Sequence, residues 1–347
     1  MRAARYHGVG DIRLEEVPEP TPGPGQVKIR VAHNGICGSD LHEYYNAATF
    51  IPAEPHPLTG AQIPCILGHE FSGTVVEVGS GVSAVAVDDR VAVRPTYSCG
   101  RCRACTATAS NICEMLAFHG GSAHGGGLSE FTVVEQDMAH RLPDSVSLES
   151  GALVEPMAVA QHAVNRVPLN TDDTVVVLGS GPIGIGVWFA LRASNIERLI
   201  VSDPSAHRRE AMAALGAQHI IDPTTQNLRE TVDRLSGGRG AAVVFDAAGV
   251  PAAFNQGLSV LAPRGTLMVV GVHEKAFDFN PTALLAGEYT VTSSMTYTDD
   301  EFAQVIENMA GGWYSTDGWV EHRPLDGLVD SLDLLRTGRA MKILIDL

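Results

Sequence analysis

The stretch Thr174-Val-Val-Val-Leu-Gly-Ser-Gly-Pro-Ile-Gly184 decides the fold of this chain. Gly179, Gly181 and Gly184 form the pattern G-x-G-x-x-G, which is weak alone because the chain contains 36 glycines. The context strengthens it: the pattern directly follows a run typical of a buried strand and precedes a helix expected over 183–193. The stretch therefore predicts the first turn of a dinucleotide-binding unit.

Each position of this turn suits a pyrophosphate. The three glycines allow a tight turn, a close approach of the backbone to the ligand, and close packing of helix on sheet. Pro182 fits the first helical position, and the free N–H groups near Ile183 can hold phosphate oxygens. Asp203 ends the next expected strand, where a carboxylate hydrogen-bonds the ribose and repels a 2′-phosphate, which favours NAD over NADP. Basic residues at 207–209 weaken that preference, and a simple turn with a helix-capping Asp203 is the alternative.

The sequence on either side of this turn predicts two kinds of structure. From about residue 150 the chain alternates strands with helices, which predicts a doubly wound parallel sheet. The expected strands are 174–178, 199–202, 242–245 and 266–270, and the expected helices are 183–193 and 206–215. The preceding part is rich in strand-like runs broken by Gly and Pro, at 27–36, 71–78 and 128–134, which predicts a barrel or sandwich. Two helix-like stretches and a strand at 341–345 close the chain.

Bulk composition limits the class of protein. A length of 347 residues favours two domains over one. The formal net charge of −16 argues against nucleic acid or an anionic membrane as the main partner. The first 17 residues lack an apolar core of signal-peptide length, and no apolar run is long enough to span a bilayer. We therefore expect a cytoplasmic protein, and the charge says little about a small neutral substrate.

Four of the six cysteines are crowded into one short segment. Cys99, Cys102, Cys105 and Cys113 give C-x2-C-x2-C-x7-C, and four thiolates can close a tetrahedral zinc site without an open position. We expect this zinc to be structural, because substrate has no room in such a site. An iron–sulfur cluster also accepts clustered cysteines, but this spacing is not one of its common ones. Four reduced thiols packed as small apolar side chains are the remaining alternative.

A second group of ligand-type residues is dispersed along the chain. Cys37, His69 and Glu155 lie in the pieces Gly-Ile-Cys-Gly-Ser-Asp-Leu-His, Gly-His-Glu and Val-Glu-Pro. A catalytic zinc needs three protein ligands and one open position for water or substrate. Spacing alone does not establish that these three residues meet.

In order and identity, these pieces, the four cysteines and the glycine-rich turn resemble the zinc-dependent medium-chain alcohol dehydrogenase family over essentially the full chain. The resemblance implies a GroES-like catalytic domain at 1–155, a Rossmann NAD-binding domain at 156–292, and a return to the catalytic domain at 293–347. It implies two zinc ions per chain, the catalytic one held by Cys37, His69 and Glu155. It also implies a homo-oligomer, either a dimer or a tetramer.

The same resemblance assigns chemical roles. Ser39 and His42 match the family's proton relay, which carries a proton from the substrate to solvent. Zinc lowers the pKa of the substrate hydroxyl, so that an alkoxide forms and releases hydride to the nicotinamide ring. The best-known members have a cysteine where this chain has Glu155, and a glutamate there resembles the polyol and diol branches. In those branches Glu70 can also approach the metal, so either carboxylate can be the direct ligand.

Further likeness points to one branch. Val270 and Val272 fall where nicotinamide contacts lie in the family. The segments 37–44, 56–60, 67–76, 125–131 and 154–160 are similar to those of 2,3-butanediol dehydrogenases. The implied reaction is oxidation of a vicinal diol by NAD, 2,3-butanediol to acetoin, and its reverse.

Three alternatives remain at this stage. A sorbitol, polyol or other secondary-alcohol dehydrogenase would have the same fold, zinc sites and cofactor as the expected butanediol dehydrogenase, and would differ from it only in substrate. A regulatory NAD-binding protein predicts a damaged metal or relay position, and a zinc-free quinone-type reductase predicts loss of the four cysteines. All of these positions are intact in the chain.

Overall fold

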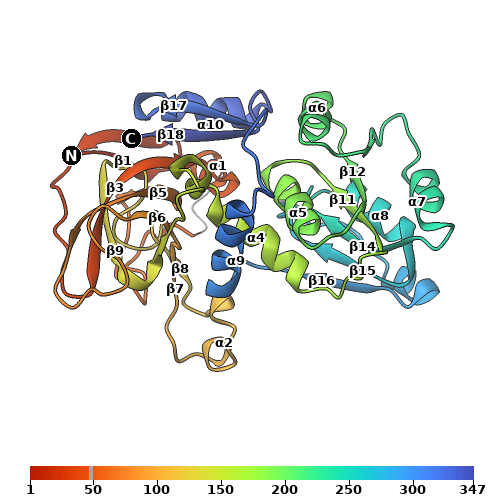
Figure 1. The fold of residues 1–347 in the computed structure, drawn as a ribbon, viewed down its shortest axis with the longest axis horizontal. Helices are drawn as coiled ribbons and strands as arrows, with labels where there is room; N and C mark the ends of the chain where they lie inside the picture. The colour runs from red at the N-terminus through yellow and green to blue at the C-terminus, as the bar shows by residue number, and fades with distance from the viewer. Residues whose placement is uncertain (47–49) are drawn as a thin grey trace. The chain divides into compact units, whose positions relative to one another are not determined.

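Two structural units make up the part of the chain that the computed structural model describes, residues 1–46 and 50–347. Unit 1 contains Met1–Glu155, Thr298–Gly311 and Trp319–Leu347, and unit 2 contains Pro156–Tyr297 and Gly312–Gly318. Both are drawn in Figure 1. The expected combination of a β-rich part and a doubly wound parallel sheet is confirmed. No helix in the described residues is long and apolar enough to cross a membrane.

Unit 2 is built on a six-stranded, fully parallel sheet in the order β13-β12-β11-β14-β15-β16. Its strands are β11 (Thr174–Leu178), β12 (Arg198–Ser202), β13 (His219–Ile221), β14 (Ala241–Asp246), β15 (Leu261–Val269) and β16 (Thr290–Ser293). Its helices are α5 (Pro182–Ala193), α6 (Ala206–Ala214), α7 (Leu228–Ser236), α8 (Pro251–Val260) and most of α4 (Val154–Asn165). Every residue of β11 is buried, as expected of a central strand covered on both faces.

Unit 1 contains the β-rich part. A seven-stranded sheet runs β10-β6-β5-β3-β18-β17, with β9 also paired to β3. Its strands are β3 (Gln26–Gly35), β5 (Glu70–Val78), β6 (Arg90–Val93), β9 (Phe131–Glu135), β10 (Ala139–Arg141), β17 (Val320–Pro324) and β18 (Lys342–Asp346). Smaller sheets contain β1 (Arg2–Gly8), β2 (Asp11–Glu16), β4 (Cys65–Ile66), and the pair β7 (Thr96–Tyr97) and β8 (Ala117–Phe118).

The described residues of unit 1 also form helices. They are α1 (Gly38–Tyr45), α2 (Arg103–Thr106), α3 (Leu148–Ala152), α9 (Asp299–Ala310) and α10 (Leu328–Arg336). Short 3₁₀ turns lie at η1 (Ser110–Ile112), η2 (Gln136–Met138), η3 (Pro281–Gly287) and η4 (Leu325–Gly327), of which η3 belongs to unit 2. The last strand, β18, pairs antiparallel with β3 and parallel with β17, so the end of the chain completes a sheet that its beginning starts (Figure 1).

Separate apolar cores stabilise the two units. In unit 1, Val27 and Ile29 of β3 share one cluster with Phe71 and Val75 of β5, and a second cluster contains Tyr6 and Leu67. Cys65, which the sequence left without a role, belongs to this second cluster and is 7% exposed, so it is a core residue. Burial raises the pKa of its thiol to about 12. In unit 2, the side chains of the sheet pack against α7 and α8.

Candidate metal centres and dinucleotide site

Helix α1 begins with a capping box that fixes the backbone around Cys37. Cys37 is the N-cap residue, and its backbone N–H donates to Oδ2 of Asp40 at 2.9 Å. An acidic side chain in the first turn also interacts favourably with the helix dipole. Asp40 is 3% exposed and anchors this turn in the interior, whereas Cys37 and Ser39 are half-buried.

The pairing of β3 with β5 brings His69 next to this turn. Gly35 pairs with Glu70 in the antiparallel ladder, so the residues just beyond each strand lie at the same end of the sheet. The ligand atoms of three side chains lie within 4.8 Å of one another, one atom each from Cys37, His69 and Glu70. Ser39 Oγ lies 3.4 Å from Nε2 of His69. The structure thus brings together three residues that the sequence placed near a catalytic metal, and the first residue of the relay.

The charges around His69 fit a cation. Burial by itself lowers the pKa of this imidazole, but the negative charges of Asp40, Cys37 and Glu155 outweigh burial and raise the pKa well above its usual value. Nδ1 of His69 lies 3.8 Å from Oδ1 of Asp40, and both atoms are buried without a hydrogen-bond partner. Zinc accepts thiolate, imidazole and carboxylate ligands, and a carboxylate behind a metal-binding histidine is a common arrangement. The donor set therefore fits a zinc ion.

A buried lysine that the sequence analysis did not predict holds Glu70. Nζ of Lys342 donates to Oε2 of Glu70, and also to the carbonyl oxygen of Ile36 at 3.0 Å. The side chains of Lys342 and Glu70 are 2% and 1% exposed. The sequence does contain a signal for this lysine: it is a lone charge at the start of the apolar run Lys-Ile-Leu-Ile.

Glu155 lies close to the same centre. It is 6% exposed, and its charge contributes to the raised pKa of His69. The group of mutually close ligand atoms contains Glu70 rather than Glu155, although one oxygen of Glu70 is bound to Lys342. Which of the two carboxylates binds the ion stays a prediction.

The two relay residues lie on one short helix. Ser39 and His42 are three residues apart on α1, a spacing that places side chains on the same helical face. Nδ1 of His42 contacts the side-chain nitrogen of Asn46 at 3.1 Å. This arrangement leaves Nε2 of His42 as the nitrogen available for proton transfer. The relay itself stays a prediction.

The four cysteines form a closed cage. The sulfur of Cys99 lies 4.0 Å from that of Cys105, and the sulfur of Cys102 lies 3.9 Å from that of Cys113. A tetrahedral zinc with Zn–S bonds of about 2.3 Å places its sulfurs roughly 3.8 Å apart. The cage therefore fits a single ion, and its sulfurs are too close together to surround a cluster of several iron and sulfide ions.

Backbone N–H groups point at the same sulfurs. Cys102 and Cys105 donate to the sulfurs of Cys99 and Cys102 at 3.3 and 3.4 Å, and Cys99 donates to the sulfur of Cys113 at 3.3 Å. Hydrogen bonds from the backbone of Cys105 and Glu114 lower the pKa of the Cys102 thiol to about 6. Burial, and then hydrogen bonds with the neighbouring cysteines, raise the pKa of the Cys105 thiol to about 11. The thiolate is the metal-binding form, so the backbone favours metal binding at Cys102, and Cys105 must lose its proton when an ion binds.

In unit 2 the glycine-rich turn has the geometry expected from its sequence. Gly179 has a φ of +86°, and a Cβ on Gly184 would lie 1.9 Å from the carbonyl oxygen of Gly179. A Cβ on Gly181 would meet nothing closer than 4.0 Å, so this backbone is open to a ligand. Gly181 is the N-cap of α5, and Pro182 and Ile183 form its first turn. The N-terminus of α5 is thus free for a pyrophosphate.

Asp203 follows β12 and points back at this turn. Its Oδ2 accepts the N–H of Ser180 at 2.8 Å, and its Oδ1 accepts the N–H of Ser205 at 2.8 Å. Ser205, not Asp203, is the N-cap of α6, so the helix-capping alternative does not hold. Nη1 of Arg208 lies 3.6 Å from Oδ2 of Asp203 and reduces the local negative charge. The aspartate is held beside the turn, where a ribose would lie.

Val270 and Val272 follow β15 at the carboxyl edge of the same sheet, where doubly wound folds bind ligands. The N–H of Val270 donates to the carbonyl oxygen of Asp246 at 2.9 Å. Val272 is 83% exposed. Their contacts with a nicotinamide stay a prediction.

Two phenylalanines that the sequence analysis did not assign lie beside His69. The ring centroids of Phe50 and Phe118 lie 6.1 and 6.3 Å from that of His69, and 6.1 Å from each other. The backbone N–H of Phe50 donates to Glu43, which fixes the start of its segment. These rings form an apolar wall at the Cys37–His69 centre. No periodic pattern in the sequence marks them, because Phe50 lies in an irregular segment and Phe118 in a strand of only two residues.

Comparison with known proteins agrees with this geometry. Residues 23–144 match the family described as Alcohol dehydrogenase GroES-like domain, and residues 182–311 match Zinc-binding dehydrogenase. The chain is therefore a member of the zinc-dependent medium-chain alcohol dehydrogenase family, an enzyme family that is zinc- and NAD(P)-dependent.

Particular relatives show which members it is similar to. It is 40% identical to "(R,R)-butanediol dehydrogenase" of Bacillus subtilis over 95% of this chain and 94% of that protein. It is 33% identical to "Sorbitol dehydrogenase" of Bombyx mori over 99% of this chain and 97% of that protein. The crystal structure of 2R,3R-butanediol dehydrogenase from Bacillus subtilis matches with a TM-score of 0.92 and 38% identity, covering 100% of this chain and 99% of that one.

Proposed function

We propose that this protein oxidises 2,3-butanediol to acetoin with NAD and catalyses the reverse reduction. The observation that carries the proposal is the 40% identity to a butanediol dehydrogenase along 95% of the chain, together with the apolar wall at the metal centre. In this reaction the diol gives a hydride to NAD and a proton to solvent, and leaves as the hydroxyketone.

In the proposed reaction, different residues of the site bind the metal and transfer the proton. Cys37 and His69 would hold the zinc, with Glu155 or Glu70 as the third ligand. When bound, zinc supplies a Lewis acid that polarises the substrate oxygen. Ser39 Oγ, 3.4 Å from His69 Nε2, would take the hydroxyl proton and pass it towards His42.

The apolar wall supports a small carbon skeleton. Phe50 and Phe118 offer no hydrogen bonds to a chain of hydroxyl groups, but they can pack against the terminal methyl groups of butanediol. A hexitol would lose hydrogen bonds with water along this wall, and such unpaired groups cost about 1–3 kcal/mol each. Sorbitol is the second candidate because relatives such as the Bombyx mori enzyme are sorbitol dehydrogenases.

An initial-rate assay decides between these substrates. Purified enzyme is given (R,R)-, (S,S)- and meso-butanediol, acetoin, sorbitol, ethanol and threonine, with NAD and NADP in parallel. We expect kcat/KM for (R,R)-butanediol to exceed that for sorbitol at least tenfold. A Phe50→Ser variant should reduce this ratio. Higher kcat/KM for sorbitol than for butanediol would reject the proposed substrate.

The remaining features are proposed on the same basis. We expect NAD rather than NADP because of Asp203, and two zinc ions per chain because two donor sets fit zinc. Metal content after substitution Glu155→Gln or Glu70→Gln tests which carboxylate is the ligand, since only the true ligand's loss should lower catalytic zinc. We also propose a homo-oligomer in the cytoplasm, which size-exclusion chromatography and cell fractionation test.

A further inference from the structure

Strand register brings three metal-binding side chains to one face of unit 1. His33 on β3 pairs directly with Asp346 on β18. His322 on β17 pairs with Leu344, two residues before Asp346 on the same strand. Because side chains alternate along a strand, His33, His322 and Asp346 all face the same side of three neighbouring strands.

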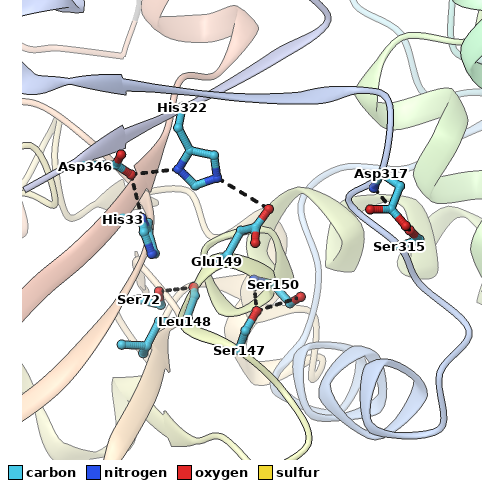
Figure 2. Close-up of polar contacts among 10 residues, drawn as sticks. All are labelled: His33, Ser72, Ser147, Leu148, Glu149, Ser150, Ser315, Asp317, His322 and Asp346. Atoms are coloured by element: carbon cyan, nitrogen blue, oxygen red, sulfur yellow. Dashed lines mark hydrogen bonds and ion pairs between the residues drawn. The ribbon is translucent and has the colours of Figure 1, made fainter.

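The three side chains converge on one point, as Figure 2 shows. Nδ1 of His33 and Nδ1 of His322 each lie 2.8 Å from the same oxygen, Oδ1 of Asp346. The two imidazole rings are 5.3 Å apart at 81°, and the three ligand atoms all lie within 4.8 Å of one another. Two ring nitrogens and a carboxylate therefore present their donor atoms to a shared space.

A second carboxylate orients one of the rings. Nε2 of His322, the nitrogen facing away from Asp346, lies 3.4 Å from Oε1 of Glu149 on α3 (Figure 2). The hydroxyl of Ser72 on β5 donates to the carbonyl oxygen of Leu148, which ties α3 to the sheet beside it. A histidine that binds a metal through one nitrogen usually donates its other N–H to a carboxylate, and Glu149 is in that position.

We propose that His33, His322 and Asp346 bind a divalent transition-metal ion, with zinc as the natural occupant, and that Glu149 orients His322. Imidazole nitrogen with carboxylate oxygen favours zinc, cobalt or nickel over magnesium or calcium. Bonds of about 2.1 Å at tetrahedral or octahedral angles place donor atoms roughly 3.0–3.4 Å apart, close to the 2.8 Å observed. The side chains of His33, His322 and Asp346 are 24%, 37% and 47% exposed, so water can complete the coordination.

This site shares no residue with the Cys37–His69 centre or the four-cysteine cage. It would cross-link β3, β18 and β17 through side chains, in addition to their backbone ladder. β18 also carries Lys342, the partner of Glu70. The ion would therefore stabilise the strand that supports the catalytic centre, without touching substrate.

Zinc binding to the holoenzyme tests the proposal. The zinc content of the purified protein is counted by mass spectrometry, the protein is titrated with zinc chloride by calorimetry, and the total zinc bound at saturation is compared between variants. The Tm is recorded with and without added zinc. His33→Gln and His322→Gln remove one ligand each, and Glu149→Gln removes only the orienting carboxylate. His219→Gln, a half-buried histidine of β13 in unit 2, is the matched control.

We expect the wild type and the His219 variant to bind one equivalent more than the His33 and His322 variants, with a higher Tm when zinc is added. Glu149→Gln should weaken this equivalent about 10- to 100-fold. Catalytic rates without added zinc should stay within about twofold in all folded variants. Equal stoichiometry and equal Tm shifts in the wild type and both ligand variants would overturn the site. If a ligand variant fails to fold, Glu149→Gln decides: unchanged affinity for the extra equivalent counts against the proposal.

Discussion

Replacing the buried histidine His119 should remove a defined part of the acid sensitivity of unit 1. His119 is 0% exposed, and its ring nitrogens contact the hydroxyls of Tyr97 at 3.1 Å and Thr132 at 2.6 Å. Burial, and then the nearby charge of His124, lower its pKa to about 3. The unfolded chain keeps a pKa of about 6.5, so only the unfolded state takes up this proton between these two values.

The size of the effect follows from these two pKa values. The contribution of His119 is fully present above about pH 6.5 and is lost as the pH falls towards 3, because the unfolded state then binds more protons. The slope is about 1.36 kcal/mol per pH unit, so wild-type protein should lose about 2 kcal/mol between pH 7 and pH 5 through this residue alone. His119→Gln keeps a hydrogen-bonding side chain and removes the titration.

Equilibrium urea unfolding at pH 7, 6 and 5, followed by circular dichroism with zinc present, measures this difference. The variant is less stable at pH 7, since the replacement packs less well, but the gap to wild type should shrink by about 2 kcal/mol at pH 5. His219→Gln is the control and should run parallel to wild type. A gap between wild type and the His119 variant that is constant across this pH range would refute the reasoning.

Other consequences concern the metal centres and the cofactor. Lys342→Met leaves the Glu70 carboxylate buried without its partner, so the free energy of unfolding should fall by about 3–5 kcal/mol. Adding Glu70→Gln should restore most of this loss. Urea unfolding of both variants measures the effect, and no recovery in the double variant would contradict the reasoning. Cys102→Ser should lower the zinc content by one ion per chain, measured by mass spectrometry, and reduce the Tm, measured by calorimetry. An unchanged zinc content would mean that the cage holds no ion. Asp203→Ser should raise the ratio of NADP to NAD kcat/KM by at least about tenfold, equivalent to 1.4 kcal/mol, and an unchanged ratio would remove Asp203 from cofactor choice.

The sequence predicted the parts of the fold that have strong local patterns. The apolar run 174–178 and the glycine turn became β11 and the start of α5, because a buried parallel strand needs a continuous apolar sequence. Helix α1 was not predicted, because only strand-like runs stand out in the first part of the sequence. This helix buries Asp40 and Glu43, and buried acidic residues do not produce an apolar period.

The sequence did not predict an exposed edge strand or the contacts between residues that are far apart in the chain. The sixth strand β16 is largely exposed, so its residues gave no sign that the sheet continued past 290. Lys342 and Glu70 are 272 residues apart, and only the pairing of β18 with β3 brings them together. The ligand trio of the expected catalytic zinc likewise came from family resemblance, since spacing does not encode which ends of which strands coincide.

The large sequence separation between β3 and β18 has a consequence for synthesis. While the ribosome is still making unit 2, β3 has no β18 beside it, and the site around Glu70 lacks Lys342. At about 5–20 residues per second, the interval between Glu155 and the last strand lasts on the order of ten seconds or more, during which a sheet edge is open to other chains. Unit 2 can fold as it emerges, whereas the catalytic centre forms only once β18 has left the ribosome. A nascent chain stalled before residue 342 should therefore depend on chaperones.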